Sequence, residues 1–383
     1  MEPIYLDNSA TTRPCGAAVQ AMQDALSAHW HNPSALYKPA LEAEKLVRAA
    51  RADCLRAAGA PAGSRLIFTS GGTEADNLAI LGHIRGMRQP GRVLLLQVEH
   101  PAVRSCADEL RRMGHQVQEI PVTARGMADL DWLEGQLGPD VRMLCVMQVN
   151  NETGAIQPLR QIAALRDRCC PQAALHVDGV QGFLWVPMDW QGVQSYAFSG
   201  PKIHACKGIG GLIVRQGHRL SPLLHGGGQE AGERSGTENT PGILAMAAAV
   251  RAFPAESVSA MRACKRQLWQ AVRDKVPDCA VNGPEPDSPD SAPHILNLSL
   301  PPVRSQTMLF ALEGEGIYVS AGSACSSHQQ KVSAVLSAMG LPARLAESAL
   351  RFSLCPENTP AQMELVAEAI ARQWQLLSRY VRR

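Results

Sequence analysis

The sequence lacks the features of a membrane or secreted protein. Its 383 residues contain no run of about 18 to 20 apolar residues, the length that a membrane-spanning helix needs. The start, Met-Glu-Pro-Ile-Tyr-Leu-Asp, has no basic stretch followed by an apolar one, as a secretory signal has. The eleven cysteines form no Cys-x-x-Cys pair and no regular spacing, which argues against a disulfide framework and against a zinc site. We therefore expect a metal-free protein of the reducing cytoplasm that does not bind membranes.

The sequence also lacks a strong excess of charge. The formal net charge is +2, and lysine and arginine form no dense stripe, so direct binding to nucleic acid is not expected. Hydrophobic residues make up 45% of the chain and charged residues 19%, which is typical of a globular protein. The length is sufficient for about two to three domain-sized units.

Short apolar runs rich in β-branched residues alternate with amphipathic helical stretches through the first two thirds of the chain. A helix over residues 41–58 presents one apolar stripe and ends at Gly59. Because strands covered on both faces are apolar at successive positions, the runs predict an α/β layer built on a mainly parallel sheet. The predicted strands are residues 66–68, 93–98, 143–149, 174–177, 196–198 and 212–214.

The pattern changes after about Arg251. A proline-rich loop over residues 283–294 separates a helix from a mixed set of strands and helices, which predicts a smaller α+β domain. The predicted helices are residues 256–275, 306–312 and 361–378, and the predicted strands are residues 295–300, 318–320 and 349–354. We predict a large domain of residues 13–252 and a small domain of residues 1–12 and 253–383.

Two polar segments follow predicted strands, where α/β proteins place their ligands. In residues 70–77, glycines and the start of a helix at Thr73 could cradle an anion, although a simple glycine turn capped by Thr73 is the alternative. In residues 176–181, Asp178 could pair with a protonated ring nitrogen and Gln181 could contact a ring oxygen. The alternative for Asp178 is a hydrogen bond to its own loop.

Two further glycine-rich segments complete the set. Residues 195–211 contain Lys202 and Lys207, either of which could form a Schiff base or remain a solvated loop charge. Residues 226–239 could provide a phosphate contact from Thr237 or act as a flexible lid. A phosphate cradle, a ring-nitrogen acid and a reactive lysine in one α/β chain together point to pyridoxal 5'-phosphate.

With these segments in place, the sequence resembles the NifS-like cysteine desulfurases, which have the class V aminotransferase fold, pyridoxal-phosphate fold type I. The resemblance implies a large domain with a mainly parallel seven-stranded sheet and a smaller α+β domain that carries a cysteine-bearing loop. It includes Tyr5-Leu-Asp-Asn-Ser-Ala-Thr-Thr12 and Gly322-Ser-Ala-Cys-Ser-Ser327. The other matching segments are residues 32–34, 70–77, 99–103, 150–154, 178–181, 226–239 and 351–354.

The resemblance implies a cofactor site. Lys202 would hold the cofactor covalently, Asp178 would pair with the ring nitrogen, Gln181 would contact the ring hydroxyl, and His100 would stack on the ring and shuttle protons. Thr237 would reach the phosphate from the other subunit of a homodimer. The full set of implied cofactor-binding residues is Gly72, Thr73, His100, Asn151, Asp178, Gln181, Ser199, Lys202 and Thr237.

The resemblance also implies the reaction. Arg351, with Asn32 and Asn151, would bind the carboxylate of L-cysteine. Lys202, His100 and Cys325 would be catalytic, and the Cys325 thiolate would take the substrate sulfur as a persulfide and leave L-alanine. The sulfur would then pass to an acceptor protein in iron–sulfur cluster assembly or in tRNA or DNA sulfur modification.

The sequence departs from the family pattern beside Lys202. Pro201 stands where the family usually has a histidine, and proline offers neither a side-chain donor nor a backbone N–H. Ala205 and Cys206 replace the usual Gly-Pro, and His31 replaces a common glycine. The hypothesis is a weaker phosphate anchor or a shifted geometry, compensated by other groups.

Two other functions compete with this interpretation. A related lyase would release sulfur or selenium from cysteine, cystine or selenocysteine without a persulfide on Cys325. A non-catalytic binding scaffold is the third reading, against which the presence of Lys202, Asp178, His100, Cys325 and Arg351 argues.

Overall fold

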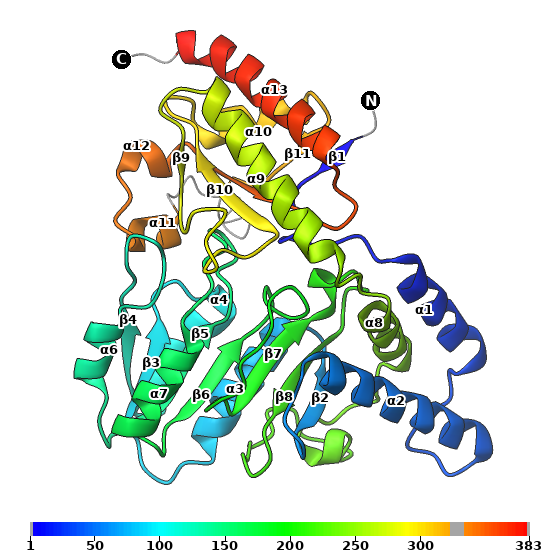
Figure 1. Ribbon diagram of the computed structural model, residues 1–383. Helices are drawn as coiled ribbons and strands as arrows, with labels where there is room; N and C mark the ends of the chain where they lie inside the picture. Colours follow the sequence, from blue (N-terminus) through cyan, green and yellow to red (C-terminus); the bar gives the residue numbers. More distant parts are fainter. Residues whose placement is uncertain (1–2, 322–332, 381–383) are drawn as a thin grey trace.

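The computed structural model describes residues 3–321 and 333–380 of the chain (Figure 1). Its main layer is a seven-stranded sheet in the order β2-β8-β7-β6-β5-β3-β4. Strand β8 runs antiparallel to both of its neighbours, and the other pairings are parallel. The strands are β2 (Arg65–Thr69), β3 (Arg92–Leu96), β4 (Gln116–Ile120), β5 (Val141–Met147), β6 (Ala174–Asp178), β7 (Ser195–Ser199) and β8 (Gly210–Val214). The predicted mainly parallel seven-stranded sheet is confirmed.

Helices cover both faces of this sheet (Figure 1). Helix α3 (Gly72–Arg85) packs against β6, β7 and β8, and its apolar residues are buried around the whole helix. Helices α1 (Gly16–Ala28), α2 (Lys38–Ala57) and α8 (Thr240–Arg251) pack together. The remaining helices along the large sheet are α4 (Pro101–Arg104), α5 (Cys106–Arg112), α6 (Leu130–Gln136) and α7 (Leu159–Cys169).

A second layer is built from the C-terminal part of the chain. Strands β12 (Ala349–Ser353), β10 (Ile295–Ser299) and β9 (Ala280–Val281) form an antiparallel sheet. The long helices α9 (Ser257–Lys275) and α13 (Pro360–Leu377) pack against each other, as Figure 1 shows. The shorter elements are α10 (Ser305–Glu313), β11 (Ile317–Tyr318), α11 (Ala334–Ala338) and α12 (Ala343–Ala346).

The N-terminus belongs to the second layer. Strand β1 (Ile4–Tyr5) pairs in parallel with β11, and Ile4 and Leu6 are buried in the same apolar cluster as α9 and α13. A separate, larger cluster lies under the seven-stranded sheet. The two clusters support the division into residues 13–252 and residues 1–12 with 253–383, which stays a prediction. In the described part of the chain, no helix is long and apolar enough to span a membrane.

Candidate active site

The candidate site lies at one edge of the seven-stranded sheet. Asp178 is the last residue of β6, Ser199 is the last residue of β7, and Lys202 follows in the short 3-10 turn Gly200–Lys202. Gly72 begins α3, directly after β2. Because β2, β6 and β7 point in the same direction, their carboxyl ends bring these residues to one place.

The start of α3 forms a tight, glycine-dependent cradle. A Cβ atom on Gly72 would lie 2.5 Å from Val180 Cγ2 and 3.5 Å from Ser199 Cβ, so the close approach requires glycine. The first N–H groups of this 14-residue helix have no partner within the helix, and they favour an anion. The Ser199 hydroxyl lies nearby, since it is 4.0 Å from the position of a Cβ on Gly71. This arrangement suits a phosphate.

Glu74 ties the cradle to the glycine-rich loop. Its carboxylate accepts a hydrogen bond from Ser70 N at 2.7 Å and forms an ion pair with Arg234 at 2.7 Å. Burial raises the Glu74 pKa, but the ion pair with Arg234 and the hydrogen bonds with Ser70 together lower it by more, so the net shift is downward. The loop that carries Thr237 is therefore fastened to the cradle.

Asp178 is a buried carboxyl group whose environment suits a cationic partner. Its Oδ1 accepts a hydrogen bond from Val180 N at 2.9 Å, and only 5% of the residue is exposed. Burial raises the Asp178 pKa, while His100 and Lys202 act to lower it. A protonated ring nitrogen at this position would stabilise the carboxylate that burial disfavours.

The charges of Asp178 and Lys202 act on His100 in opposite directions. His100 caps α4, where its Nδ1 accepts a hydrogen bond from Ala102 N at 3.1 Å. Burial lowers the His100 pKa, with Asp178 raising it and Lys202 lowering it further. A neutral imidazole is therefore favoured, and the bond at Nδ1 leaves Nε2 as the nitrogen for proton transfer.

Arg351 on β12 is held in a fixed orientation. Its Nη2 forms an ion pair with Asp7 Oδ1 at 2.7 Å, and its Nη1 donates to Asn151 O at 2.9 Å. Its Nε is buried and has no hydrogen-bond partner among the described residues. The guanidinium therefore keeps an N–H for a carboxylate. Sequence reasoning missed Asp7, although it belongs to the matching segment of residues 5–12.

The N-terminal segment of residues 7–12 runs along the candidate site. Besides the contact of Asp7 with Arg351, Gln181 Nε2 donates to Ser9 O at 2.9 Å and Lys202 Nζ donates to Ala10 O. Thr12 binds the carbonyl oxygen of Pro201. This segment therefore contacts three of the predicted site residues through different atoms.

Some predicted residues are not joined to this cluster by the contacts of the described chain. Asn32 is exposed between α1 and α2, where its Oδ1 accepts a hydrogen bond from Ser34 N at 3.0 Å. Thr73 and Thr237 are both exposed. Lys207 is exposed as well, which favours Lys202 over Lys207 as the reactive lysine.

Cys325 lies outside the described residues, but the flanks of its segment are described. Ser320 pairs with the backbone of Arg351, with N···O distances of 3.1 and 2.7 Å. On the other side, Ser333 Oγ donates to the buried carboxylate of Glu152. Glu152 follows Asn151, whose carbonyl oxygen binds Arg351. One flank is therefore tied to the backbone of Arg351, and the other to Glu152, the neighbour of the residue that binds the Arg351 guanidinium.

Among the described residues, no group of three or more His, Cys, Asp or Glu side chains could hold a metal ion. The site contains a lysine and a buried aspartate beside a phosphate-type cradle at the edge of an α/β sheet, which defines the class of enzymes that hold an aldehyde cofactor through lysine.

The chain belongs to the aminotransferase class V family, whose model matches residues 4–366, and this family depends on pyridoxal phosphate. It is 38% identical over 379 residues to a cysteine desulfurase of Nostoc sp. (strain PCC 7120), covering 97% of this chain and 92% of the relative. It is 36% identical over 375 residues to the cysteine desulfurase NifS of Azotobacter vinelandii, with 97% and 92% covered. A solved NifS-like protein superposes on this chain with a TM-score of 0.90 at 30% identity. The superposition covers 98% of this chain and 100% of that one.

Proposed function

We propose that this protein is a cysteine desulfurase that converts L-cysteine to L-alanine and carries the sulfur as a persulfide on Cys325. The observation that carries the proposal is Arg351. The guanidinium is buried and fixed by Asp7 and Asn151, the backbone of Arg351 pairs with Ser320 before the Cys325 segment, and Glu152, next to Asn151, accepts a hydrogen bond from Ser333 after it. The identities of 38% and 36% to cysteine desulfurases over nearly the whole chain support it.

The residues present fit pyridoxal phosphate. Gly72, Thr73 and Ser199 would hold the phosphate, and Lys202 would hold the aldehyde carbon. The ring would be held by Asp178 at its nitrogen, by Gln181 at its hydroxyl, and by His100 and Asn151 beside it. When bound, pyridoxal phosphate supplies an electron sink for bond changes at the α-carbon of an amino acid.

The substrate carboxylate would be bound by Arg351, because a guanidinium held on two sides by Asp7 and Asn151 has a fixed orientation and keeps further N–H donors. Because Nδ1 accepts the Ala102 N–H, the neutral imidazole of His100 carries its proton on Nε2, so His100 would donate that proton and then recover one. The Cys325 thiolate would attack the substrate sulfur, so that an S–S bond forms and the substrate C–S bond breaks. The persulfide would then pass to a sulfur-acceptor protein.

Product analysis tests this function directly. With L-cysteine and a thiol reductant, we expect alanine and sulfide in equal amounts, and no turnover of cystine in the absence of free cysteine. Turnover of cystine or selenocysteine in preference to cysteine would favour the competing lyase. A protein that gives no alanine from cysteine although it binds the cofactor would favour the scaffold.

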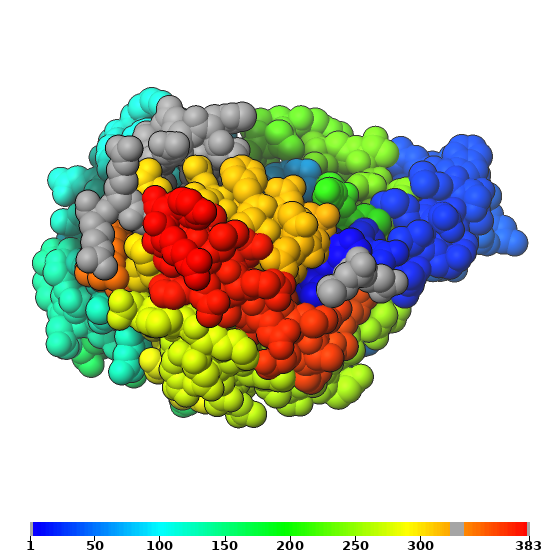
Figure 2. All heavy atoms as spheres, turned by 90° about the horizontal axis from the view of Figure 1, so that it is seen from above, coloured from blue at the N-terminus to red at the C-terminus, as the bar shows by residue number. Residues whose placement is uncertain are grey.

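We also propose a homodimer, because large apolar side chains are exposed together on α1, α2 and the turn between them. Trp30 is 66% exposed, Leu36 91% and Tyr37 53%, and Leu26 on α1 is 61% exposed. Figure 2 shows α1 and α2, in blue, projecting at one end of the molecule. A second copy covering this surface would remove these side chains from water and would bring a second Thr237 into the assembly.

Replacing Leu36 and Tyr37 together by glutamate is expected to raise the dimer dissociation constant by at least about 100-fold, because two buried apolar contacts become charged. Sedimentation velocity at several concentrations measures it. Leu376→Glu, at a 49% exposed position on α13, is the matched control and is expected to leave the dimer intact. A wild-type protein that sediments as a monomer would refute the proposal.

A cytoplasmic location is likewise proposed. The ten cysteines of the described part of the chain are all free thiols, which suits a reducing compartment.

A further inference from the structure

The turn that carries Lys202 contains a proline and so has few anchoring groups of its own. Pro201 stands between Gly200 and Lys202 and has no N–H, and its ring carries no hydrogen-bond donor. Gly200 N donates to Ile209 O at 3.0 Å, and Ile203 N closes the turn on Gly200 O at 3.0 Å. These bonds leave the carbonyl oxygens of Pro201 and Lys202 to be held by other parts of the chain.

Thr12 holds the first of these two carbonyl groups. Its backbone N donates to Pro201 O at 2.8 Å, and its Oγ1 donates to the same oxygen at 2.9 Å. The same Oγ1 accepts a hydrogen bond from His204 N at 2.8 Å. Only 4% of Thr12 is exposed, so water does not compete effectively for these bonds. Thr12 therefore binds the backbone on both sides of Lys202, at Pro201 and at His204.

Trp185 holds the second carbonyl group. Its indole Nε1 donates to Lys202 O at 3.0 Å, and 3% of the residue is exposed. The indole ring stacks on His294, with centroids 5.1 Å apart, and meets the edge of Phe253 at 4.8 Å. These two rings fix the direction in which the N–H points.

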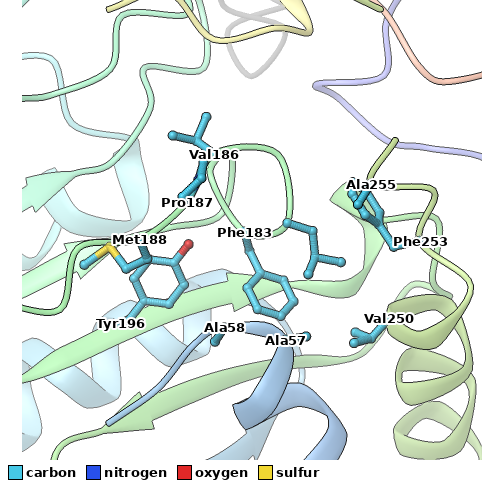
Figure 3. A pocket seen from close by; sticks show the side chains of 11 residues that line it. Ala57, Ala58, Phe183, Val186, Pro187, Met188, Tyr196, Val250, Phe253 and Ala255 are labelled. Carbon is cyan, nitrogen blue, oxygen red and sulfur yellow. The ribbon is translucent and has the colours of Figure 1, made fainter. Parts of the chain in front are cut away.

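The chain neighbours of Trp185 are apolar, although the imidazole of His204 also lies with its centroid 6.1 Å from the indole ring. Leu184 and Val186, its chain neighbours, line an apolar pocket of about 390 Å³ together with Phe253. Figure 3 shows Phe253 and Val186 at the rim of this pocket, with Phe183 and Tyr196 below them. Loss of the indole N–H would therefore remove the hydrogen bond that Trp185 donates to Lys202 O.

We propose that Thr12 and Trp185 are positioning residues for Lys202, which together hold the lysine-bearing turn through its backbone carbonyl groups. The inference rests on the proposed function, in which Lys202 links to pyridoxal phosphate. Neither residue is among those that would bind the cofactor. They act on Lys202 through the two backbone carbonyl groups, at Pro201 and at Lys202, so their removal changes how well the lysine is presented.

Two pairs of variants, each with a matched control, test the proposal. Thr12→Val removes only the hydroxyl group, and Thr12→Ser keeps it. Trp185→Phe removes the N–H, and Trp190→Phe is the matched control, because Trp190 is also buried and its Nε1 donates to Ala58 O at 2.8 Å. We expect Thr12→Val and Trp185→Phe each to raise the dissociation constant of the apoprotein for pyridoxal phosphate about tenfold, as one lost buried hydrogen bond does. Thr12→Ser and Trp190→Phe should stay within about twofold of the wild type.

Titration of the visible absorbance gives the dissociation constant, and its pH midpoint gives a second readout that a general loss of stability would not shift. The thermal midpoint of each apoprotein shows whether the variants fold. The inference is overturned if Thr12→Val and Trp185→Phe bind the cofactor as tightly as their controls, with an unchanged pH midpoint. It is also overturned if Trp190→Phe weakens binding as much as Trp185→Phe. Lys202→Ala distinguishes the two claims: if that variant keeps the visible absorbance, the proposed function fails instead.

Discussion

Replacing Lys202 by alanine is expected to abolish the visible absorbance of the cofactor-loaded protein and to lower cysteine turnover by at least about 10³-fold. Lys202 is the lysine that interacts electrostatically with both Asp178 and His100. Its turn follows β7 at the edge of the sheet where the cradle of α3 begins. No other group described at this edge combines a primary amine with these neighbours. Absorbance spectra and alanine formation measure the two effects.

Lys207→Ala is the matched control for this experiment. Lys207 is five positions along the same glycine-rich segment but is exposed, so its loss should leave both readouts within about twofold of the wild type. If Lys207→Ala instead loses the visible absorbance and Lys202→Ala keeps it, the assignment of the reactive lysine is wrong.

Replacing Cys325 by alanine is expected to separate cofactor chemistry from sulfur transfer. The variant should retain its visible absorbance and its response to added cysteine, because Asp178, Lys202 and Arg351 are unchanged. Alanine and sulfide production should fall by at least about 10³-fold, since no thiolate remains to accept the substrate sulfur. Single-turnover measurements distinguish the lost chemical step from weakened binding.

Cys206→Ala is the control for Cys325→Ala. Cys206 is half-buried near the lysine-bearing turn, and burial raises its thiol pKa, which makes it a poor nucleophile. Its removal should leave sulfide release within about twofold of the wild type. Full sulfide release by Cys325→Ala would establish the competing lyase mechanism.

The main strands could be predicted from the sequence because they are buried on both faces. Six of the seven strands of the large sheet coincide with apolar runs, as in β6 and β8, where every residue is buried. Strand β4 was missed because it lies at the edge of the sheet, and its residues Gln116, Gln118 and Glu119 are polar. An edge strand pairs on one side only and has less need of apolar residues.

The site residues that directly follow a predicted strand could be predicted from the sequence. Asp178, Ser199 and Lys202 follow strands, and their meeting at one sheet edge follows from parallel pairing. The Asp7–Arg351 ion pair was not predictable from spacing, because 344 positions separate the two residues along the chain. Their contact depends on the pairing of β1 with β11 and on the bridge between Asp7 and Ser353.

The hydrogen bonds that hold the turn around Pro201 are a second feature that only the structure could supply. The sequence indicates a proline beside Lys202 without indicating which groups bind the turn. Thr12 and Trp185 come from two distant segments, before α1 and after β6. Their side chains donate hydrogen bonds to backbone carbonyl oxygens, those of Pro201 and Lys202. Backbone acceptors leave no trace in a sequence pattern.

The most direct test of the central claim is mass spectrometry of the Cys325 peptide after the cofactor-loaded protein reacts with one equivalent of L-cysteine and no reductant. The account predicts one additional sulfur atom on Cys325 and an equal amount of alanine in solution. Both should disappear when Cys325 is alkylated beforehand. Alanine formed in full while Cys325 carries no additional sulfur would contradict the account.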